Sequence, residues 1–227
     1  MAQRMLVKAC DLVIISDFDG TIAECDTTDL LLSRFASPSW HEIEHRWEVG
    51  EIGSAECMRQ QIALIMATED DLKKTLDTVR LDAGFADFAE ICRQSDIPLM
   101  IVSDGLDASI KYLLEKNHLS NLPITANRLI CNENSSFRLE TPHEIKNCRV
   151  LAGVCKCNVI RNFIKTHDRT RVIFIGDGRS DFCAAGIADM VLAKASLLEY
   201  CRKNSIPHLP INDFVDAKRE LMDILKF

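Results

Sequence analysis

The chain has 227 residues, of which 47% are hydrophobic and 27% are charged. This composition is typical of a globular protein with a hydrophobic core, and the length allows one large domain or a core with a small accessory domain. The net charge of −7 argues against a general nucleic-acid-binding surface, which needs a basic face. We therefore expect no nucleic-acid partner, whereas a small anionic substrate needs only one or two local cations.

No apolar run is long enough to cross a bilayer, so the sequence predicts no transmembrane helix and no membrane partner. The N-terminal segment resembles a signal peptide, but Asp11 interrupts it, and cleavage nearby would remove the first predicted strand. We therefore expect the protein to be cytoplasmic. Its ten cysteines are scattered along predicted helices and strands, which favours reduced thiols over a disulfide scaffold.

The first predicted strand, residues 12–15, is apolar and leads directly to Asp17 and Asp19. Side chains two positions apart on an extended backbone point the same way, so these two carboxylates converge on one small volume. Two carboxylates at such a short distance raise each other's pKa unless a cation lies between them. The simplest interpretation is a nucleophilic carboxylate, an acid/base carboxylate and a Mg²⁺ ion for phosphoryl transfer. Taken alone, an Asp-rich glycine turn is also compatible with a plain surface turn.

The next segment, residues 25–82, has helix-start signals but no clear strand. Ser37 precedes Pro38 at a first helical position, Ser54 begins another helical stretch, and Thr68 begins a capping-box pattern. We interpret this segment as a small helical cap domain that is inserted after the first motif.

Three further apolar runs predict buried parallel strands, at residues 99–102, 172–175 and 190–192. Helical periodicity lies between and after them, and a β-hairpin is predicted over residues 122–139. Strand and helix alternate, which predicts an α/β fold with a doubly wound, Rossmann-like parallel sheet. The core domain would comprise residues 1–24 and 83–227.

Polar residues follow the later strands and begin the later helices. Ser103 and Asp104 come after the second strand, where a serine is often only a helix cap. Lys156 begins a helix, where a cation is unfavourable to the helix dipole, although a surface lysine is the default interpretation. Asp177 and Asp181 follow the strand at residues 172–175 in the pattern G-D-G-x-x-D.

The order D-F-D-G-T, strand-Ser, Lys and G-D-G-x-x-D resembles the haloacid dehalogenase superfamily of phosphatases over nearly the whole chain. The helical insert is similar to the cap of the phosphoserine phosphatase-like branch. Within that branch, S-D-F-D-G-T-I, C-K-C and V-L-A-K-x-x-L-L-x-Y-C look most like the 2-hydroxy-3-keto-5-methylthiopentenyl-1-phosphate phosphatase group of methionine salvage. The resemblance implies a phosphoric monoester hydrolase that acts on a small phosphorylated metabolite.

The resemblance implies a role for each residue of the catalytic motifs. Asp17 would attack the phosphoryl group and become an aspartyl phosphate, and Asp19 would act first as an acid and then as a base. Ser103, Asp104 and Lys156 would bind the phosphoryl oxygens.

The same resemblance implies a Mg²⁺ cofactor. Its ligands would be Asp17, the backbone carbonyl of Asp19, and Asp177, with Thr21 and Asp181 supporting the site.

Two further positions concern the substrate. Asp26 falls where phosphoserine phosphatases use Glu to contact the substrate, so it is a candidate specificity residue. Those enzymes have S-G-G at the second motif, whereas this chain has Asp104 after Ser103. An Asp104 side chain that pointed inward would weaken phosphate binding. It could equally point outward, or cap the next helix and leave its backbone N–H for phosphate. This departure weakens the case for phosphoserine as the substrate.

Other interpretations stay open. The chain could be a phosphoserine phosphatase or another small-metabolite phosphatase, or, less favoured, a non-catalytic metal-binding regulatory domain. A zinc site at Cys148, Cys155 and Cys157 is also conceivable. Their spacing is not the paired C-x-x-C of a zinc finger, so we favour reduced structural thiols that pack around the loop presenting Lys156.

Overall fold

The computed structural model describes residues 11–132, 136–167 and 170–225. Within these ranges a seven-stranded sheet has the order β4-β3-β2-β1-β5-β6-β7. The strands are β1 (Leu12–Ser16), β2 (Leu99–Leu106), β3 (Ile124–Cys131), β4 (Phe137–Glu140), β5 (Arg171–Gly176), β6 (Met190–Ala193) and β7 (His208–Pro210). Neighbouring strands are parallel except β3 and β4, which are antiparallel.

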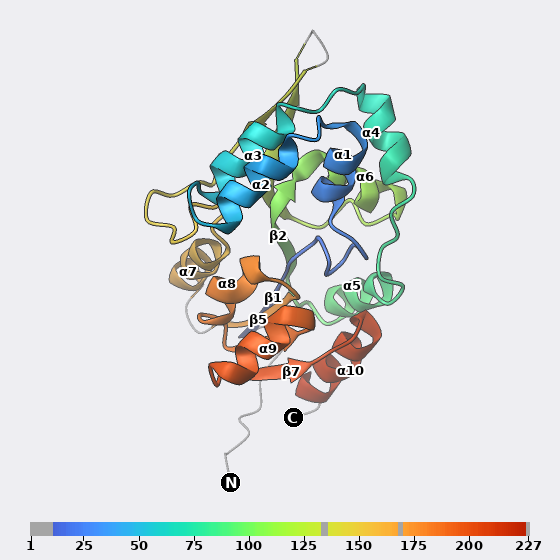
Figure 1. Ribbon diagram of the computed structural model, residues 1–227. Coiled ribbons are helices and arrows are strands. Elements are labelled where there is room, and N and C mark those ends of the chain that lie inside the picture. The colour runs from blue at the N-terminus through green and yellow to red at the C-terminus, as the bar shows by residue number, and fades with distance from the viewer. Residues whose placement is uncertain (1–10, 133–135, 168–169, 226–227) are drawn as a thin grey trace.

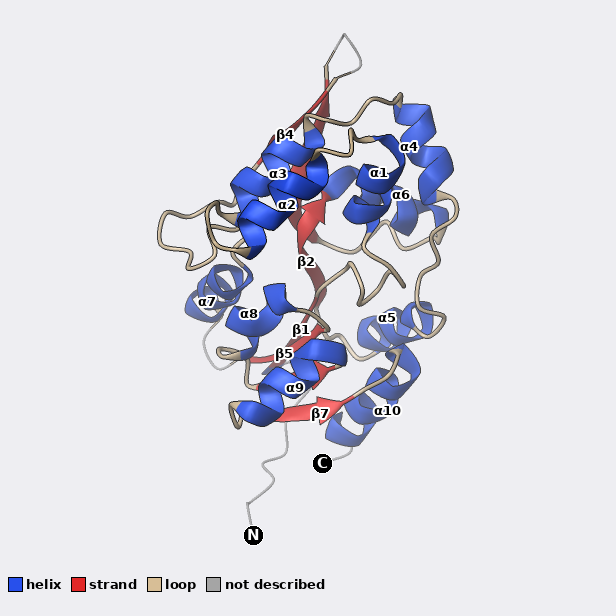
Figure 2. Ribbon diagram, in the orientation of Figure 1, coloured by secondary structure: helices blue, strands red, loops and turns tan. Residues whose placement is uncertain are grey.

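Helices cover both faces of the sheet, with α5 and α10 on one side and α7, α8 and α9 on the other (Figure 2). The helices are α1 (Thr27–Phe35), α2 (Trp40–Glu48), α3 (Ser54–Ile62), α4 (Glu69–Leu76), α5 (Phe85–Gln94), α6 (Asp107–Lys116), α7 (Lys156–Thr166), α8 (Phe182–Ala185), α9 (Ala195–Lys203) and α10 (Phe214–Leu225). In the described part of the chain, none of them combines the length and apolar character needed to cross a membrane.

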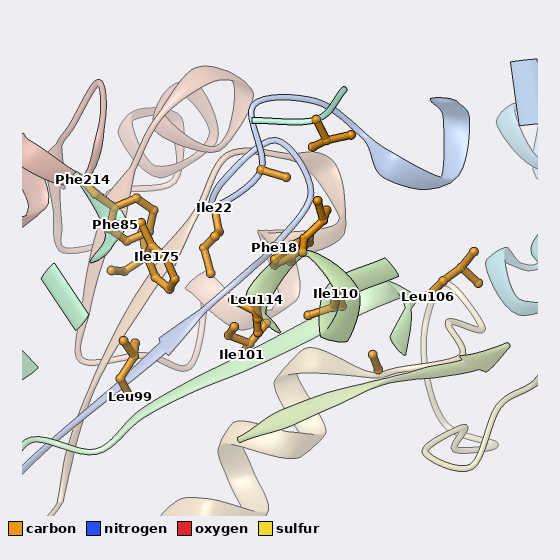
Figure 3. Packing of buried hydrophobic residues seen from close by; sticks show 14 of the residues in the cluster. Phe18, Ile22, Phe85, Leu99, Ile101, Leu106, Ile110, Leu114, Ile175 and Phe214 are labelled. Atoms are coloured by element: carbon orange, nitrogen blue, oxygen red, sulfur yellow. The ribbon is translucent and has the colours of Figure 1, made fainter. Parts of the chain in front are cut away.

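The central strand β1 is buried on both faces because its side chains alternate between two hydrophobic clusters. Leu12 and Ile14 pack in the cluster that contains α5, α6 and α10, whereas Val13 and Ile15 pack in the cluster of α7, α8 and α9. Figure 3 shows part of the first cluster. The rings of Phe85 and Phe214 from α5 and α10 meet there edge to face, with centroids 4.9 Å apart. The first strand is therefore a rigid support for the residues that follow it.

The helical cap consists of α1 to α4 and lies between β1 and α5 in the sequence (Figure 1). At its base Ala23 and Leu81 form an antiparallel bridge, and the N–H of Glu24 donates to the carbonyl of Arg80 at 3.0 Å. The chain thus enters and leaves the insert through two adjacent segments. The exact domain boundaries at 25–82 stay a prediction.

The predicted doubly wound α/β fold with an inserted cap is confirmed. The hairpin predicted over residues 122–139 is formed by β3 and β4, and Thr68 forms the capping box of α4. The expected helix start at Pro38 is wrong by two residues. A turn comes first, in which the carbonyl of Ser37 accepts from the N–H of Trp40 at 3.0 Å.

Candidate active site

The predicted site residues lie at the carboxyl ends of adjacent parallel strands. β1 lies between β2 and β5, and the order of the strands reverses there, which is where open α/β sheets bind ligands. A pocket of about 390 Å³ opens at this edge. Asp17 and Asp177 follow β1 and β5, Ser103 lies in the second half of β2, and all three line the pocket.

The turn after β1 brings the first and last acidic motifs together. Asp17 is buried, and its N–H donates to the carbonyl of Ile175 at 2.9 Å. Gly20 has a φ of +70°, and a Cβ there would lie 2.6 Å from an oxygen of Asp177. Glycine, which has no Cβ, can adopt this left-handed backbone conformation and leaves room for the carboxylate of Asp177. The hydroxyl of Thr21 donates to Asp177 at 2.8 Å and holds its carboxylate in place.

Lys156 is a buried cation at the first position of α7. Its Nζ lies 2.6 Å from Oδ1 of Asp17 and 2.6 Å from Oδ1 of Asp181, and donates to the hydroxyl of Ser180 at 3.2 Å. Burial alone would lower the pKa of Lys156, but the two adjacent carboxylates outweigh burial and raise it above the usual value. These carboxylates also explain why a cation is stable at a helix N-terminus.

Oxygen atoms of Asp17, Asp177 and Asp181 lie within 4.8 Å of one another. Both oxygens of Asp181 are already engaged: one with Lys156, the other with the N–H groups of Asp177 and Gly178 at 3.0 Å each. Burial is the main reason that the pKa of Asp177 is raised, and the hydrogen bond from Thr21 opposes it. One ammonium group does not offset these three carboxylates, and their hard oxygen donors fit a divalent cation such as Mg²⁺. The supporting role of Asp181 stays a prediction.

Asp19 has two differently occupied carboxylate oxygens. Oδ1 accepts from the N–H and the hydroxyl of Thr27, at 2.8 and 2.7 Å. Oδ2 lies 3.5 Å from the Ser103 hydroxyl, and a Cβ on Gly105 would approach it to 2.4 Å. Burial, and then the charge of Asp26, raise the pKa of Asp19 to about 7, while Thr27 opposes the shift. The carboxyl group is thus able to exchange a proton near neutral pH.

Asp26 lines the pocket but also has a structural task. It is the N-cap of α1, where one carboxylate oxygen accepts from the N–H of Asp29 at 2.9 Å. Its role in specificity stays a prediction.

Asp104 neither points outward nor caps a helix, because β2 continues through it and α6 begins at Asp107. Its carboxylate instead accepts from the Ser54 hydroxyl, the Asn127 amide and the Val154 N–H, at 2.9, 3.0 and 2.9 Å. A role for Asp104 in phosphate binding stays a prediction and would involve its backbone.

The three cysteines near Lys156 lie in or beside the loop that precedes it. Cys155 and Cys157 have their sulfur atoms 3.4 Å apart, and the N–H of Ala152 approaches the sulfur of Cys148 at 3.4 Å. Among the described residues, the aspartate trio is the group of potential ligands close enough to share a metal ion. Structural thiols stay our prediction for these cysteines.

Sequence reasoning missed the contacts that hold the catalytic motifs in place. Thr27 follows a helix N-cap, and this pattern could have indicated that its N–H was available to Asp19. Ser180 lies within the G-D-G-x-x-D pattern but gives no local sign that it contacts Lys156. The stacking of Arg179 over Trp47 of the cap, at 5.7 Å, has no local sequence signal either.

The fold is that of haloacid dehalogenase-type hydrolases, and the matching family and relatives define a phosphatase, a phosphoric monoester hydrolase. The chain belongs to the family described as "Putative Phosphatase", whose model matches residues 12–197. The predicted family resemblance is therefore confirmed.

Two similar relatives are named 2-hydroxy-3-keto-5-methylthiopentenyl-1-phosphate phosphatase. The protein from Geobacillus thermodenitrificans is 31% identical over 213 residues, and the one from Geobacillus kaustophilus is 32% identical over 216 residues. Each match covers 91% of this chain and 93% of the relative.

Solved structures share the fold. A haloacid dehalogenase family hydrolase from Salmonella enterica has a TM-score of 0.70 at 16% identity, over 95% of this chain and 70% of that one. A phosphoserine phosphatase with a phospho-aspartyl intermediate analogue has a TM-score of 0.66 at 19% identity, over 94% of this chain and 97% of that one.

Proposed function

We propose that this protein is a Mg²⁺-dependent phosphomonoesterase that works through an aspartyl phosphate on Asp17. The observation that carries the proposal is the placement of Asp17 at the pocket edge, 2.6 Å from Lys156 and beside Asp177. A nucleophilic carboxylate, a phosphate-binding cation and a second carboxylate for a metal are the parts that phosphoryl transfer needs.

In the first half-reaction, a carboxylate oxygen of Asp17 attacks phosphorus, and the bond to the leaving alcohol oxygen breaks. Asp19 gives its proton to that oxygen, and Thr27 orients the carboxyl group by its two hydrogen bonds. Ser103 and Lys156 bind the phosphoryl oxygens and offset the charge that develops on them.

In the second half-reaction, Asp19 accepts a proton from water while the water oxygen attacks phosphorus. The bond between phosphorus and Asp17 breaks, and inorganic phosphate is released. Asp19 thus returns to its protonated form and Asp17 to its carboxylate.

Asp17, Asp177 and the backbone carbonyl of Asp19 would hold Mg²⁺ when it is bound, and Thr21 and Asp181 would orient them. The ion would supply positive charge beside the phosphoryl oxygens.

For the substrate, we infer a small phosphorylated metabolite, because cap and core residues together line a pocket of about 390 Å³. The names of the similar relatives support 2-hydroxy-3-keto-5-methylthiopentenyl-1-phosphate in particular. A panel of phosphate esters, assayed with purified protein and Mg²⁺, tests this assignment. We expect this metabolite to have a higher kcat/KM than phosphoserine, and phosphoserine as the best substrate would contradict it.

A further inference from the structure

The carboxylate of Asp104 joins three separate parts of the molecule. One oxygen accepts from the hydroxyl of Ser54, the first residue of cap helix α3, at 2.9 Å. The other accepts from the Asn127 amide on β3 at 3.0 Å and from the Val154 N–H at 2.9 Å. Val154 lies two positions before Lys156, so one carboxylate contacts both the cap and the loop that presents the phosphate-binding lysine.

The same loop also contacts the cap directly. The N–H groups of Ser54 and Ala55, at the start of α3, donate to the carbonyls of Val150 and Leu151 at 3.1 and 2.9 Å. These N–H groups have no partner within their own helix, so the loop satisfies them. The N-terminus of helix α3 is thereby hydrogen-bonded to the loop that leads to Lys156.

Farther along α3, Arg59 donates to the Thr141 hydroxyl at 2.7 Å and pairs with Glu144. The contacts between α3 and this loop therefore extend along the helix and are not confined to its first turn.

The hydrogen bonds also explain how a carboxylate is tolerated beside a phosphate site. Three donors fix Asp104 toward the cap and the loop, which disperses its negative charge. The loop comes close because residue 153 is glycine: a Cβ there would lie 2.2 Å from the side-chain oxygen of Asn127. The geometry therefore accounts for an aspartate at a position where phosphoserine phosphatases have glycine.

We propose that Asp104 is a positioning residue that latches the cap onto the core. Its hydrogen bond with Ser54 holds α3 closed over the pocket and in register with the loop that carries Lys156. Helix α3 lines the pocket through Ser54, Cys57 and Gln61, so movement of α3 away from the pocket requires this bond to break. The latch concerns the proposed phosphatase site, but its closed state is measurable without any substrate.

Hydrogen exchange of the Ser54 and Ala55 amides provides the first test. Ser54→Ala removes the hydroxyl and keeps the main-chain N–H. We expect exchange at both amides to become about tenfold faster, because one hydrogen bond to a charged acceptor is lost. Ser54→Thr keeps the hydroxyl and should exchange like wild type. Amides of α10 serve as the control for general loosening. Equal protection in wild type and Ser54→Ala would overturn the proposal, whatever the enzyme hydrolyses.

Steady-state kinetics provide the second test, on the best substrate of the phosphate-ester panel. We expect Ser54→Ala to raise KM about tenfold without lowering kcat, because the chemistry is intact and only the closed population falls. The double variant with Asp104→Ala should have the same KM as Asp104→Ala alone, since Asp104→Ala already breaks the bond that Ser54→Ala removes. A fall in kcat at unchanged KM, or fully additive effects, would contradict the latch. If Asp104→Ala does not fold, the comparison of Ser54→Ala with Ser54→Thr still decides.

Discussion

The ammonium group of Lys156 lies 2.6 Å from a carboxylate oxygen of Asp17, and their side chains are only 2% and 6% exposed. The pair is enclosed, and Asp181 provides a second carboxylate at the same distance from the ammonium. In such surroundings, each charge is tolerable only while its partners are present. The lysine that we assign to phosphate binding is therefore also a structural residue.

Replacing this lysine should cost both stability and activity. Lys156→Met leaves two buried carboxylates without their cation, so we expect a loss of about 3–5 kcal/mol in the free energy of unfolding. Urea unfolding at neutral pH measures this loss. Lys111→Met breaks only the i,i+4 ion pair between an exposed lysine and the partly buried Asp107, and should cost at most about 0.5 kcal/mol. If both variants lose the same free energy of unfolding, the buried pair contributes no more to stability than the pair of Lys111 with Asp107.

The proposed nucleophile can be tested by an isosteric change. Asp17→Asn keeps the size of the side chain but removes the attacking carboxylate, so hydrolysis of an aryl phosphate should fall by at least about 10³-fold. Circular dichroism should show that the variant is folded. Wild type should bind beryllofluoride as a mimic of the aspartyl phosphate, and the variant should not. An active Asp17→Asn protein would assign the nucleophile elsewhere.

Metal dependence is the next expectation. Chelation should abolish aryl phosphate hydrolysis, and added Mg²⁺ should restore it, because the carboxylates of Asp17 and Asp177 share a site with too little positive charge. Asp177→Ala should raise the Mg²⁺ concentration needed for half-maximal rate. Undiminished turnover by metal-free protein would rule out this cofactor.

Asp26 has a capping role and a proposed specificity role, which two substitutions separate. Asp26→Ala removes the cap of α1 and should lower the free energy of unfolding by about 1 kcal/mol. Asp26→Asn retains a capping oxygen and should stay nearly as stable as wild type. Both variants should lower kcat/KM for the metabolite and spare an aryl phosphate. Equal effects on the two substrates would remove Asp26 from specificity.

The cap side of the pocket contains an acidic cluster that should make stability depend on pH. Partial burial, and then the charges of Asp26 and Glu44, raise the pKa of Asp29 from 3.8 to about 6. The folded chain thus binds this proton more tightly than the unfolded chain, and the Asp29 contribution to stability falls as pH rises from about 4 to about 7. Asp29→Asn should therefore gain stability over wild type across this range. If the two proteins differ by the same free energy of unfolding in urea at pH 4.5 and at pH 7, the predicted contribution of Asp29 is wrong.

The sequence was most informative where the physical cause is local. The apolar run before Asp17 predicts a buried strand, and the alternation within D-F-D predicts two convergent carboxylates, because both follow from backbone geometry over a few residues. The direction of the Asp104 side chain was not predictable, because its donors come from distant segments. The strand β7 was missed because it has three residues and ends in a proline.

The bridge between Ala23 and Leu81 also bears on how such proteins diversify. The main chain enters and leaves the cap at neighbouring points, which a short reverse turn could join in place of the cap. The proposed reaction centre, with Asp17, Lys156 and Asp177, comes from outside that segment. We therefore expect the nucleophile and the metal ligands to be separable from the cap, whereas Asp19 depends on Thr27 of the cap for its orientation. A relative's cap that keeps a threonine at the position of Thr27 should therefore change the preferred substrate and leave the reaction unchanged.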